Sequence, residues 1–151
     1  MKYIRKSICS LLLCVSMLAV LLTGCSGGKG TAATGNARIL IATCAKGDAF
    51  RDMLIAALES ACDEQGIGHD TVYAEQSAEQ QVAQVKEAKS QGYTAVICRL
   101  IDVDTALQVE RAADGLPVIF VNNCPDEGYL KADEYIYVAS NESVAGSYQA
   151  Q

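Results

Sequence analysis

The segment RILIATCAKGDAFRDMLIAALESACDEQG, residues 38–66, decides the fold class. Its first six residues form an apolar, β-branched run with the length of a buried strand. The residues that follow place apolar side chains three or four positions apart, which predicts a helix from about Ala49 to Gln65. Gly66 is a typical residue after the C-terminus of a helix. A strand followed at once by a helix is typical of α/β proteins.

The same alternation continues along the chain. The pattern predicts four further short strands, which are Thr71 to Ala74, Ala95 to Cys98, Val118 to Val121 and Tyr135 to Ala139. It also predicts three further helices, which run from Ser77 to about Gln91, from Asp102 to about Asp114, and onward from near Asn141. This alternation implies right-handed crossovers and a parallel sheet with helices on both faces. The expected fold class is therefore α/β, in a three-layer αβα arrangement.

Length and composition fit one globular domain behind a removable segment. The chain has 151 residues, half of them hydrophobic and a fifth charged, with only two prolines. Such a chain can bury a core and is neither disordered nor collagen-like. Removal of residues 1–24 leaves 127 residues with nine basic and eighteen acidic side chains, a formal charge of −9. This acidity argues against a nucleic-acid partner.

The N-terminus predicts export and lipidation. Met1 to Ser7 carries three positive charges, and Ile8 to Leu22 is an apolar run of 15 residues, as in a secretory signal. A membrane-spanning helix needs about 20 residues, although a retained membrane anchor is the alternative interpretation. The residues LTGC that end at Cys25 resemble the lipobox of bacterial lipoproteins, which implies a lipid on Cys25 at the outer face of the cytoplasmic membrane. We expect a signal peptide over residues 1–24 and a lipidated flexible tether over residues 25–36.

Four cysteines remain after processing, namely Cys44, Cys62, Cys98 and Cys124. The chain has no C-x-x-C pair and one histidine, so neither a zinc site nor another cofactor is expected. Export makes a disulfide possible, and four thiols allow three pairings. The apolar strand and helix contexts favour the alternative that these cysteines are small buried hydrophobic residues.

The predicted binding region is one edge of the sheet. Parallel sheets bind ligands beyond the carboxyl ends of their strands. The loops at these ends are Cys44 to Asp48, Arg99 to Asp102 and Asn122 to Asp126.

Two stretches around these loops carry a family resemblance. They are YTAVICRLIDVDTA, residues 93–106, and GLPVIFVNNCP, residues 115–125, which is followed by DEYIYVASNESVAG, residues 133–146. Together with the lipobox, they resemble the type I periplasmic binding proteins of sugar ABC transporters, and among these the galactose- and glucose-binding members most closely. The resemblance covers residues 37–151 and implies the flavodoxin-like strand order of an N-terminal lobe.

The resemblance implies a two-lobed protein that closes about a hinge on a ligand held between its lobes. The first strand that crosses between the lobes would fall near Ser140 and Asn141. Because 151 residues cannot contain the second lobe, we expect this sequence to be a fragment or a truncated reading frame that binds sugar very weakly.

Individual residues match the family in part. Asp48 resembles the carboxylate that accepts hydrogen bonds from sugar hydroxyls, and Phe50 the aromatic residue that stacks on the sugar ring. Arg99 stands where galactose binders usually have Asn, and Cys44 where Tyr can stand, which speaks against galactose itself. The candidate ligand-binding residues are Asp48, Phe50, Arg99, Asp102 and Asn122, while no catalytic residue and no metal site are expected.

The candidates also have structural interpretations. Asp48 is alternatively a helix N-cap, and Phe50 the first core residue of that helix. Arg99 either pairs with Asp102 or reaches an anionic group on a sugar acid or another carboxylate ligand. Asn122 and the neighbouring Asn123 are alternatively turn residues.

Other polar residues are expected to have no ligand role. Lys46 is interpreted as solvated, and His69 as inert before an edge strand. The acidic run suggests calcium but lacks the spacing of an EF-hand loop, so we interpret it as a solvated loop; it comprises Asp126, Glu127, Asp133 and Glu134.

Three functions remain as hypotheses. The favoured one is an extracytoplasmic, lipid-anchored receptor that captures a monosaccharide or related small polar ligand for the permease subunits of an ABC transporter. The second is a lipoprotein that presents a sugar or autoinducer to a membrane sensor. The third, an enzyme that uses Asp48 or Cys44, lacks the G-x-S-x-G, H-E-x-x-H and phosphate-loop motifs and a base near either side chain.

Overall fold

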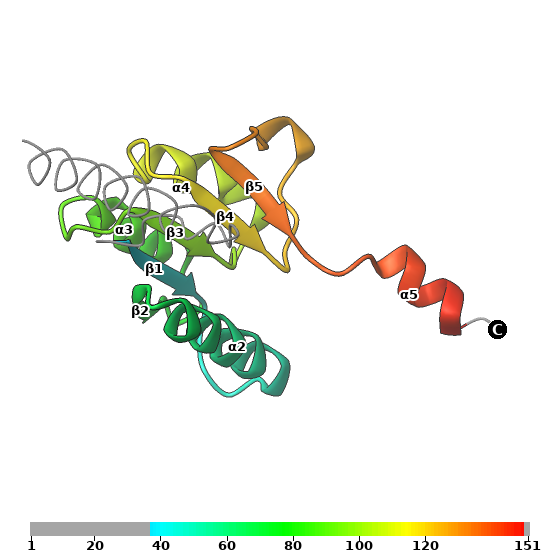
Figure 1. Ribbon diagram of the computed structural model, residues 1–151. Coiled ribbons are helices and arrows are strands. Elements are labelled where there is room, and N and C mark those ends of the chain that lie inside the picture. Colours follow the sequence, from blue (N-terminus) through cyan, green and yellow to red (C-terminus); the bar gives the residue numbers. More distant parts are fainter. Residues whose placement is uncertain (1–36, 150–151) are drawn as a thin grey trace, which may run out of the picture. The chain divides into compact units, whose positions relative to one another are not determined.

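The computed structural model describes residues 37–149 (Figure 1). The signal peptide expected over residues 1–24, the tether over residues 25–36 and the lipidation site Cys25 lie outside these described residues and stay predictions. Within the described part, no helix combines the length and the apolar character that a membrane span requires.

Five short strands form one parallel sheet. They are β1 (Arg38–Thr43), β2 (Gly68–Tyr73), β3 (Ala95–Cys98), β4 (Val118–Val121) and β5 (Tyr135–Val138). Their order is β2-β1-β3-β4-β5, and each strand runs parallel to its neighbours. The predicted α/β class and flavodoxin-like strand order are therefore confirmed, as Figure 1 shows.

The helices lie between the strands as predicted, and the differences concern where some elements begin and end. They are α2 (Ala49–Gln65), α3 (Ala78–Ala88), the 3₁₀ turn η2 (Val103–Thr105) that leads into α4 (Ala106–Ala112), the 3₁₀ turn η3 (Glu127–Tyr129) and α5 (Glu142–Gln149). Helix α3 ends three residues earlier than predicted, in a turn that uses Gly92 at φ +82°. The helix expected from Asp102 begins with η2 instead. Strand β2 begins at Gly68 rather than Thr71, because an edge strand tolerates polar residues.

Alternate residues of the strands are buried in two separate cores. One core lies between the sheet and the helices α3 and α4; from the strands it takes Leu40, Ala42, Val96, Cys98, Val118 and Phe120. The other core lies under α2; from the strands it takes Ile41, Ile97 and Val121, which pack with Ile55. This period of two follows from the pleat of a strand and fixes which residues each helix layer covers.

Helix α2 covers only part of its face of the sheet. On β5, Ile136 and Val138 point to this face and are 40 % and 54 % exposed. Tyr135 and Tyr137, which point the other way, pack against the core under α3 and α4. A helix is about 10 Å wide and neighbouring strands lie about 4.8 Å apart, so one helix shields about two strands. The expectation that both faces are covered therefore fails at β5 among the described residues.

The amino-terminal edge of the sheet is closed by its own polar groups. Nη2 of Arg38 lies 2.6 Å from Oδ2 of Asp70, and the hydroxyl of Tyr93 donates to the same oxygen at 2.9 Å. The guanidinium also stacks 4.3 Å from the centre of the Tyr93 ring. The hydrogen bond from Arg38 holds the pKa of Asp70 below its ordinary value.

The four cysteines of the described residues are free thiols, so the possible disulfide is not formed. Cys44, Cys62 and Cys98 are buried, and burial raises the pKa of Cys98 to about 12. Cys124 is exposed in the loop after β4, where the expectation of a buried hydrophobic residue is wrong.

The acidic run is a solvated loop. Asp126 caps η3 by accepting a hydrogen bond from the amide of Gly128 at 2.8 Å, and Glu134 pairs with Lys131. Among residues 37–149, no cluster of three or more His, Cys, Asp or Glu side chains is arranged to hold a metal ion.

The Glu110→Gln substitution is expected to stabilise the fold at neutral pH. Glu110 on α4 is 7 % exposed, and its Oε1 is buried with no hydrogen-bond partner. Burial raises the pKa of this carboxyl. Because a raised pKa penalises the charged form, we expect a gain of about 1 kcal/mol in unfolding free energy at pH 7.

Urea unfolding at pH 7 and pH 3 measures this effect. At pH 3 the carboxyl is protonated in both states, so the difference between wild type and variant should shrink. The exposed Glu87→Gln on α3 is the matched control and should change stability little at either pH. A Glu110→Gln variant less stable than wild type at pH 7 would contradict the argument.

Candidate ligand-binding site

The loops after β1 and β3 meet at the point where the connections switch from one face of the sheet to the other. The chain leaves β1 for α2 on one face of the sheet and leaves β3 for α4 on the other, although the two strands are neighbours. Such topological switch points open a crevice at the carboxyl edge of parallel sheets. The predicted loops Cys44 to Asp48 and Arg99 to Asp102 both begin here.

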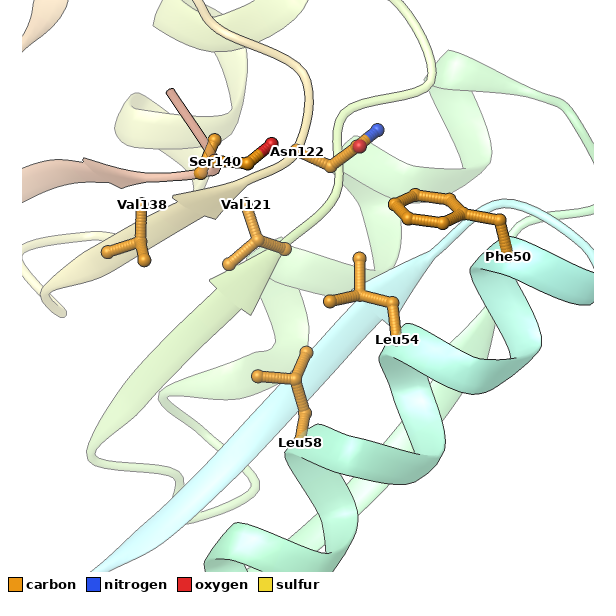
Figure 2. A pocket seen from close by; sticks show the side chains of 8 residues that line it. Phe50, Leu54, Leu58, Val121, Asn122, Val138 and Ser140 are labelled. Atoms are coloured by element: carbon orange, nitrogen blue, oxygen red, sulfur yellow. The ribbon is translucent and has the colours of Figure 1, made fainter. Parts of the chain in front are cut away.

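A cavity lies beside this point, between α2 and the ends of β4 and β5 (Figure 2). Its volume is about 310 Å³, which is within the range of small-molecule sites. Two of the predicted residues, Phe50 and Asn122, line it together; the other lining residues are Leu54, Leu58, Val121, Val138, Ala139 and Ser140. The cavity thus combines apolar walls with an amide and a hydroxyl at one end.

Phe50 is not a core residue. Its side chain is 55 % exposed, and Figure 2 shows its ring extending from α2 toward Asn122. The alternative that Phe50 opens the core of the helix is therefore wrong, because the strands beneath this end of α2 leave its ring outside. An exposed ring at the mouth of a cavity offers an apolar face to a ligand.

The two predicted aspartates are helix caps. Oδ1 of Asp48 accepts a hydrogen bond from the amide of Arg51 at 2.9 Å, and Oδ1 of Asp102 accepts one from the amide of Asp104 at 3.0 Å. The capping interpretation of Asp48 is confirmed. Neither aspartate lines the cavity of Figure 2, and their ligand roles stay predictions.

Arg99 contacts Cys44 rather than Asp102. Its Nη1 donates to Sγ of Cys44 at 3.1 Å, and no carboxylate oxygen of the described residues forms an ion pair with it. The proposed pair with Asp102 is therefore wrong, since that carboxylate caps η2. A ligand contact by Arg99 stays a prediction.

Asn122 is a turn residue whose side chain also faces the cavity. Its φ of +66° lies in the left-handed region, which Asn tolerates better than most residues. Its carbonyl accepts a hydrogen bond from the hydroxyl of Tyr137 at 3.0 Å, and its amide nitrogen donates to Oδ1 of Asn123 at 2.7 Å. The turn interpretation is confirmed, and the ligand role stays a prediction.

Sequence reasoning missed two residues that hold these loops. Gln81 on α3 is fully buried; its Nε2 donates to the carbonyl of Arg99 at 2.9 Å, and its Oε1 accepts from the amide of Ile101 at 3.1 Å. Asn123 donates to the carbonyl of Leu100 at 2.7 Å. The sequence did contain a signal for Gln81, because this polar residue lies four positions before the inward-facing Val85 and therefore on the same face of the helix.

The arrangement suits binding rather than group transfer. The single histidine of the chain, His69, lies within β2 at the sheet edge, rather than before it as expected, and contacts Asp63 and the carbonyl of Ile67. No imidazole therefore stands beside Cys44 or Asp48 to activate it. An α/β lobe with an apolar, amide-lined cavity at its carboxyl edge defines a small-molecule binding protein.

Comparison with known families agrees with this class. A model of the periplasmic binding protein domain matches residues 39–151. The chain belongs to this family, whose members are binding proteins and not enzymes. No curated protein matches the chain in sequence.

Solved structures share the fold at low identity. The periplasmic ribose ABC transporter protein of Conexibacter woesei has 18 % identity and a TM-score of 0.67, over 76 % of this chain and 38 % of its own. An ABC transporter solute-binding protein of Bacillus halodurans with bound myo-inositol has 22 % identity and a TM-score of 0.58, over 80 % and 45 %. The fructose-binding periplasmic domain of a hybrid two-component system has 20 % identity and a TM-score of 0.54, over 76 % and 41 %. The chain thus spans less than half the length of each.

The Gln81→Met substitution is expected to loosen the loop after β3. Methionine keeps the length of the side chain but leaves the Arg99 carbonyl and the Ile101 amide without their buried partner. We expect a loss of about 2 kcal/mol in unfolding free energy, measured by urea denaturation.

Amide hydrogen exchange at Ile101 should accelerate in the same variant. Gln80→Met, one position along the same helix and exposed, is the matched control and should change neither quantity. Equal stability of the Gln81 and Gln80 variants would show that the buried amide does not hold the loop.

Proposed function

We propose that this chain is the N-terminal lobe of an extracytoplasmic solute-binding protein that captures a sugar for an ABC transporter. A galactose-, glucose- or ribose-like sugar is the expected ligand. In this proposal residues 1–24 are a lipoprotein signal peptide, residues 25–36 a tether lipidated at Cys25, and residues 37–151 the lobe. The permease subunits of the transporter are the expected protein partners.

The observation that carries the proposal is the cavity of Figure 2. A sugar presents C–H groups on its face and hydroxyls on its edge. The exposed ring of Phe50 and the side chain of Leu54 suit the face, while Asn122 and Ser140 suit the edge. The free oxygen of the Asp48 carboxylate, at the start of the same helix, supplies a stronger acceptor for hydroxyl donors.

The structural relatives support the same ligand class. Two belong to ABC transporters, and one of these holds myo-inositol, a cyclic polyol. Both are more than twice as long as the part that this chain matches, which supports a second lobe that closes on the ligand from the other side. A single lobe leaves most hydroxyls in water, so we expect residues 25–151 alone to bind sugars far more weakly than a complete protein.

The Phe50→Ala substitution is expected to weaken sugar binding about tenfold, because a stacking surface is lost while the fold is kept. The measurement is isothermal titration calorimetry of a panel of pentoses, hexoses and myo-inositol. It uses the mature protein with all the sequence that its gene encodes.

The matched control is Met53→Ala. Met53 lies on the same helix, is 66 % exposed and does not line the cavity, so its loss should leave affinity unchanged. Equal losses in the two variants, or no binding of any panel member to the wild type, would refute the proposed site.

A sensory receptor is the second candidate. The observation in its favour is the likeness to a fructose-binding periplasmic domain that belongs to a two-component system. In this role the lipoprotein presents a sugar or autoinducer to a membrane sensor. Genes for permease subunits beside this gene would favour transport, whereas a histidine kinase gene would favour sensing.

The Cys25→Ala substitution is expected to move the protein from the membrane fraction to the soluble fraction of the cell envelope. The thiol of Cys25 is the proposed attachment point, and the acyl chains provide the anchor. Labelling with radioactive palmitate measures the lipid directly, and Cys44→Ala is the control that should keep the label. Label retained in Cys25→Ala would overturn the lipidation proposal.

A further inference from the structure

Arg99, a cation at the carboxyl edge, has no ion-pair partner among the described residues. Arg99 directly follows β3, and its amide still donates to the carbonyl of Ala42 in β1 at 3.0 Å, so it stands at the switch point itself. Nη1 donates to the thiol of Cys44, which is a weak acceptor. Nε is buried and makes no hydrogen bond among the described residues. A buried donor without a hydrogen bond calls for an explanation, and an acceptor on a ligand is one such explanation.

The other two arginines near the sheet ends each have a carboxylate within ion-pair distance, although Nε of Arg51, like Nε of Arg99, is buried without a hydrogen bond among the described residues. Arg38 lies 2.6 Å from Asp70, and Arg51 lies 3.8 Å from Asp48. The acid nearest to Arg99 in the sequence is Asp102, whose carboxylate caps η2. The positive charge of Arg99 is therefore offset by no carboxylate of residues 37–149.

The backbone that carries Arg99 is held firmly. Gln81 bonds the Arg99 carbonyl and the Ile101 amide, and Asn123 bonds the Leu100 carbonyl between them. Asn123 in turn accepts from Asn122, which lines the cavity of Figure 2. The loop of Arg99 and the cavity are thus joined by one chain of hydrogen bonds, which holds the backbone that carries the cation in place relative to Asn122 at the cavity wall.

We infer that Arg99 makes the site selective for a sugar acid, a ligand that carries one carboxylate beside its hydroxyls; this inference rests on the proposed function. A planar guanidinium matches a planar carboxylate, and charge-assisted hydrogen bonds are about twice as strong as neutral ones. The other cation of these loops, Lys46, lies over the ring of Tyr73, and the same edge carries the negative charges of Asp48 and Asp102. This balance of charge favours a monocarboxylate over the dianion of a sugar phosphate.

The test compares matched pairs of probes by isothermal titration calorimetry. The pairs are D-galacturonate with D-galactose and D-glucuronate with D-glucose, and glucose 6-phosphate represents the dianion. The protein is the mature Cys25→Ala form with all the sequence that its gene encodes. We expect at least one acid to bind about tenfold more tightly than its neutral partner and than the phosphate.

Two variants and a control assign the preference to Arg99. Arg99→Asn should bring the ratio of acid to neutral affinity close to one, while Arg99→Lys keeps a charge and should retain part of the preference. Arg111→Gln removes an exposed charge on α4 and should leave the ratio unchanged. If circular dichroism shows that Arg99→Asn does not fold, two other measurements test the inference. They are the ratio of acid to neutral affinity in Arg99→Lys and the loss of acid binding by the wild type at raised salt.

The outcomes separate this inference from the proposed function. Neutral sugars that bind as tightly as their acids would overturn the inference and leave the sugar site intact. An acid preference that survives in Arg99→Asn would also overturn it. If glucose 6-phosphate bound more tightly than the sugar acids, the preferred ligand would be a sugar phosphate and the inference would be overturned. Failure of every sugar, acid and polyol to bind would overturn the proposed function as well.

Discussion

The candidate site depends on one buried amide. Gln81 projects from α3 and pairs with the carbonyl of Arg99 and the amide of Ile101, so a helix side chain takes the place of a neighbouring strand after β3 ends. Without it, two backbone groups at the carboxyl edge would be buried and unpaired, at a cost of about 1 to 3 kcal/mol each. The same amide fixes the start of the loop that presents Arg99, and through Leu100 and Asn123 it fixes the turn after β4. The geometry of two ligand loops therefore follows from one helix position.

The cavity follows from a second constraint, the width of a single helix. Helices α3 and α4 cover one face of the sheet, whereas in the part of the chain that the structure describes α2 alone packs on the other. Strand pleating sends Ile136 and Val138 of β5 to this second face, at a strand that α2 does not reach. The space between α2 and these strand ends is hollow and apolar, and Phe50 and Asn122 stand at its mouth. Uneven coverage of the sheet thus places an apolar wall next to the polar loops of the carboxyl edge.

Much of this fold could be predicted from the sequence, because strand and helix periods are local properties. The bounds of α2, β3 and β4 match the predicted ones. The edge strand β2 was predicted too short, since its polar start is stabilised by pairing with β1 and not by its own composition. The site was predictable in part: the loops and the meeting of Phe50 with Asn122 were expected, but the pairing of Arg99 with Cys44 was not. Arg99 and Cys44 meet because β1 and β3 are neighbours in the sheet. The spacing of residues along the chain does not reveal which strands are neighbours.

Buried polar groups without a hydrogen bond differ in whether they can become neutral. Nε of Arg99 and Oε1 of Glu110 are both buried without a hydrogen bond among the described residues, as are Nε of Arg51 and Oε1 of Gln84. Glu110 lies within the helix layer, where burial raises its pKa and the acid can escape its penalty by taking up a proton. A guanidinium has no such escape, since it stays charged at every physiological pH. Arg99 stands at the edge where parallel sheets receive ligands. In the sugar-acid proposal, the carboxylate of the ligand supplies the counterpart of this permanent charge, so that a group left unsatisfied in the lobe alone serves binding.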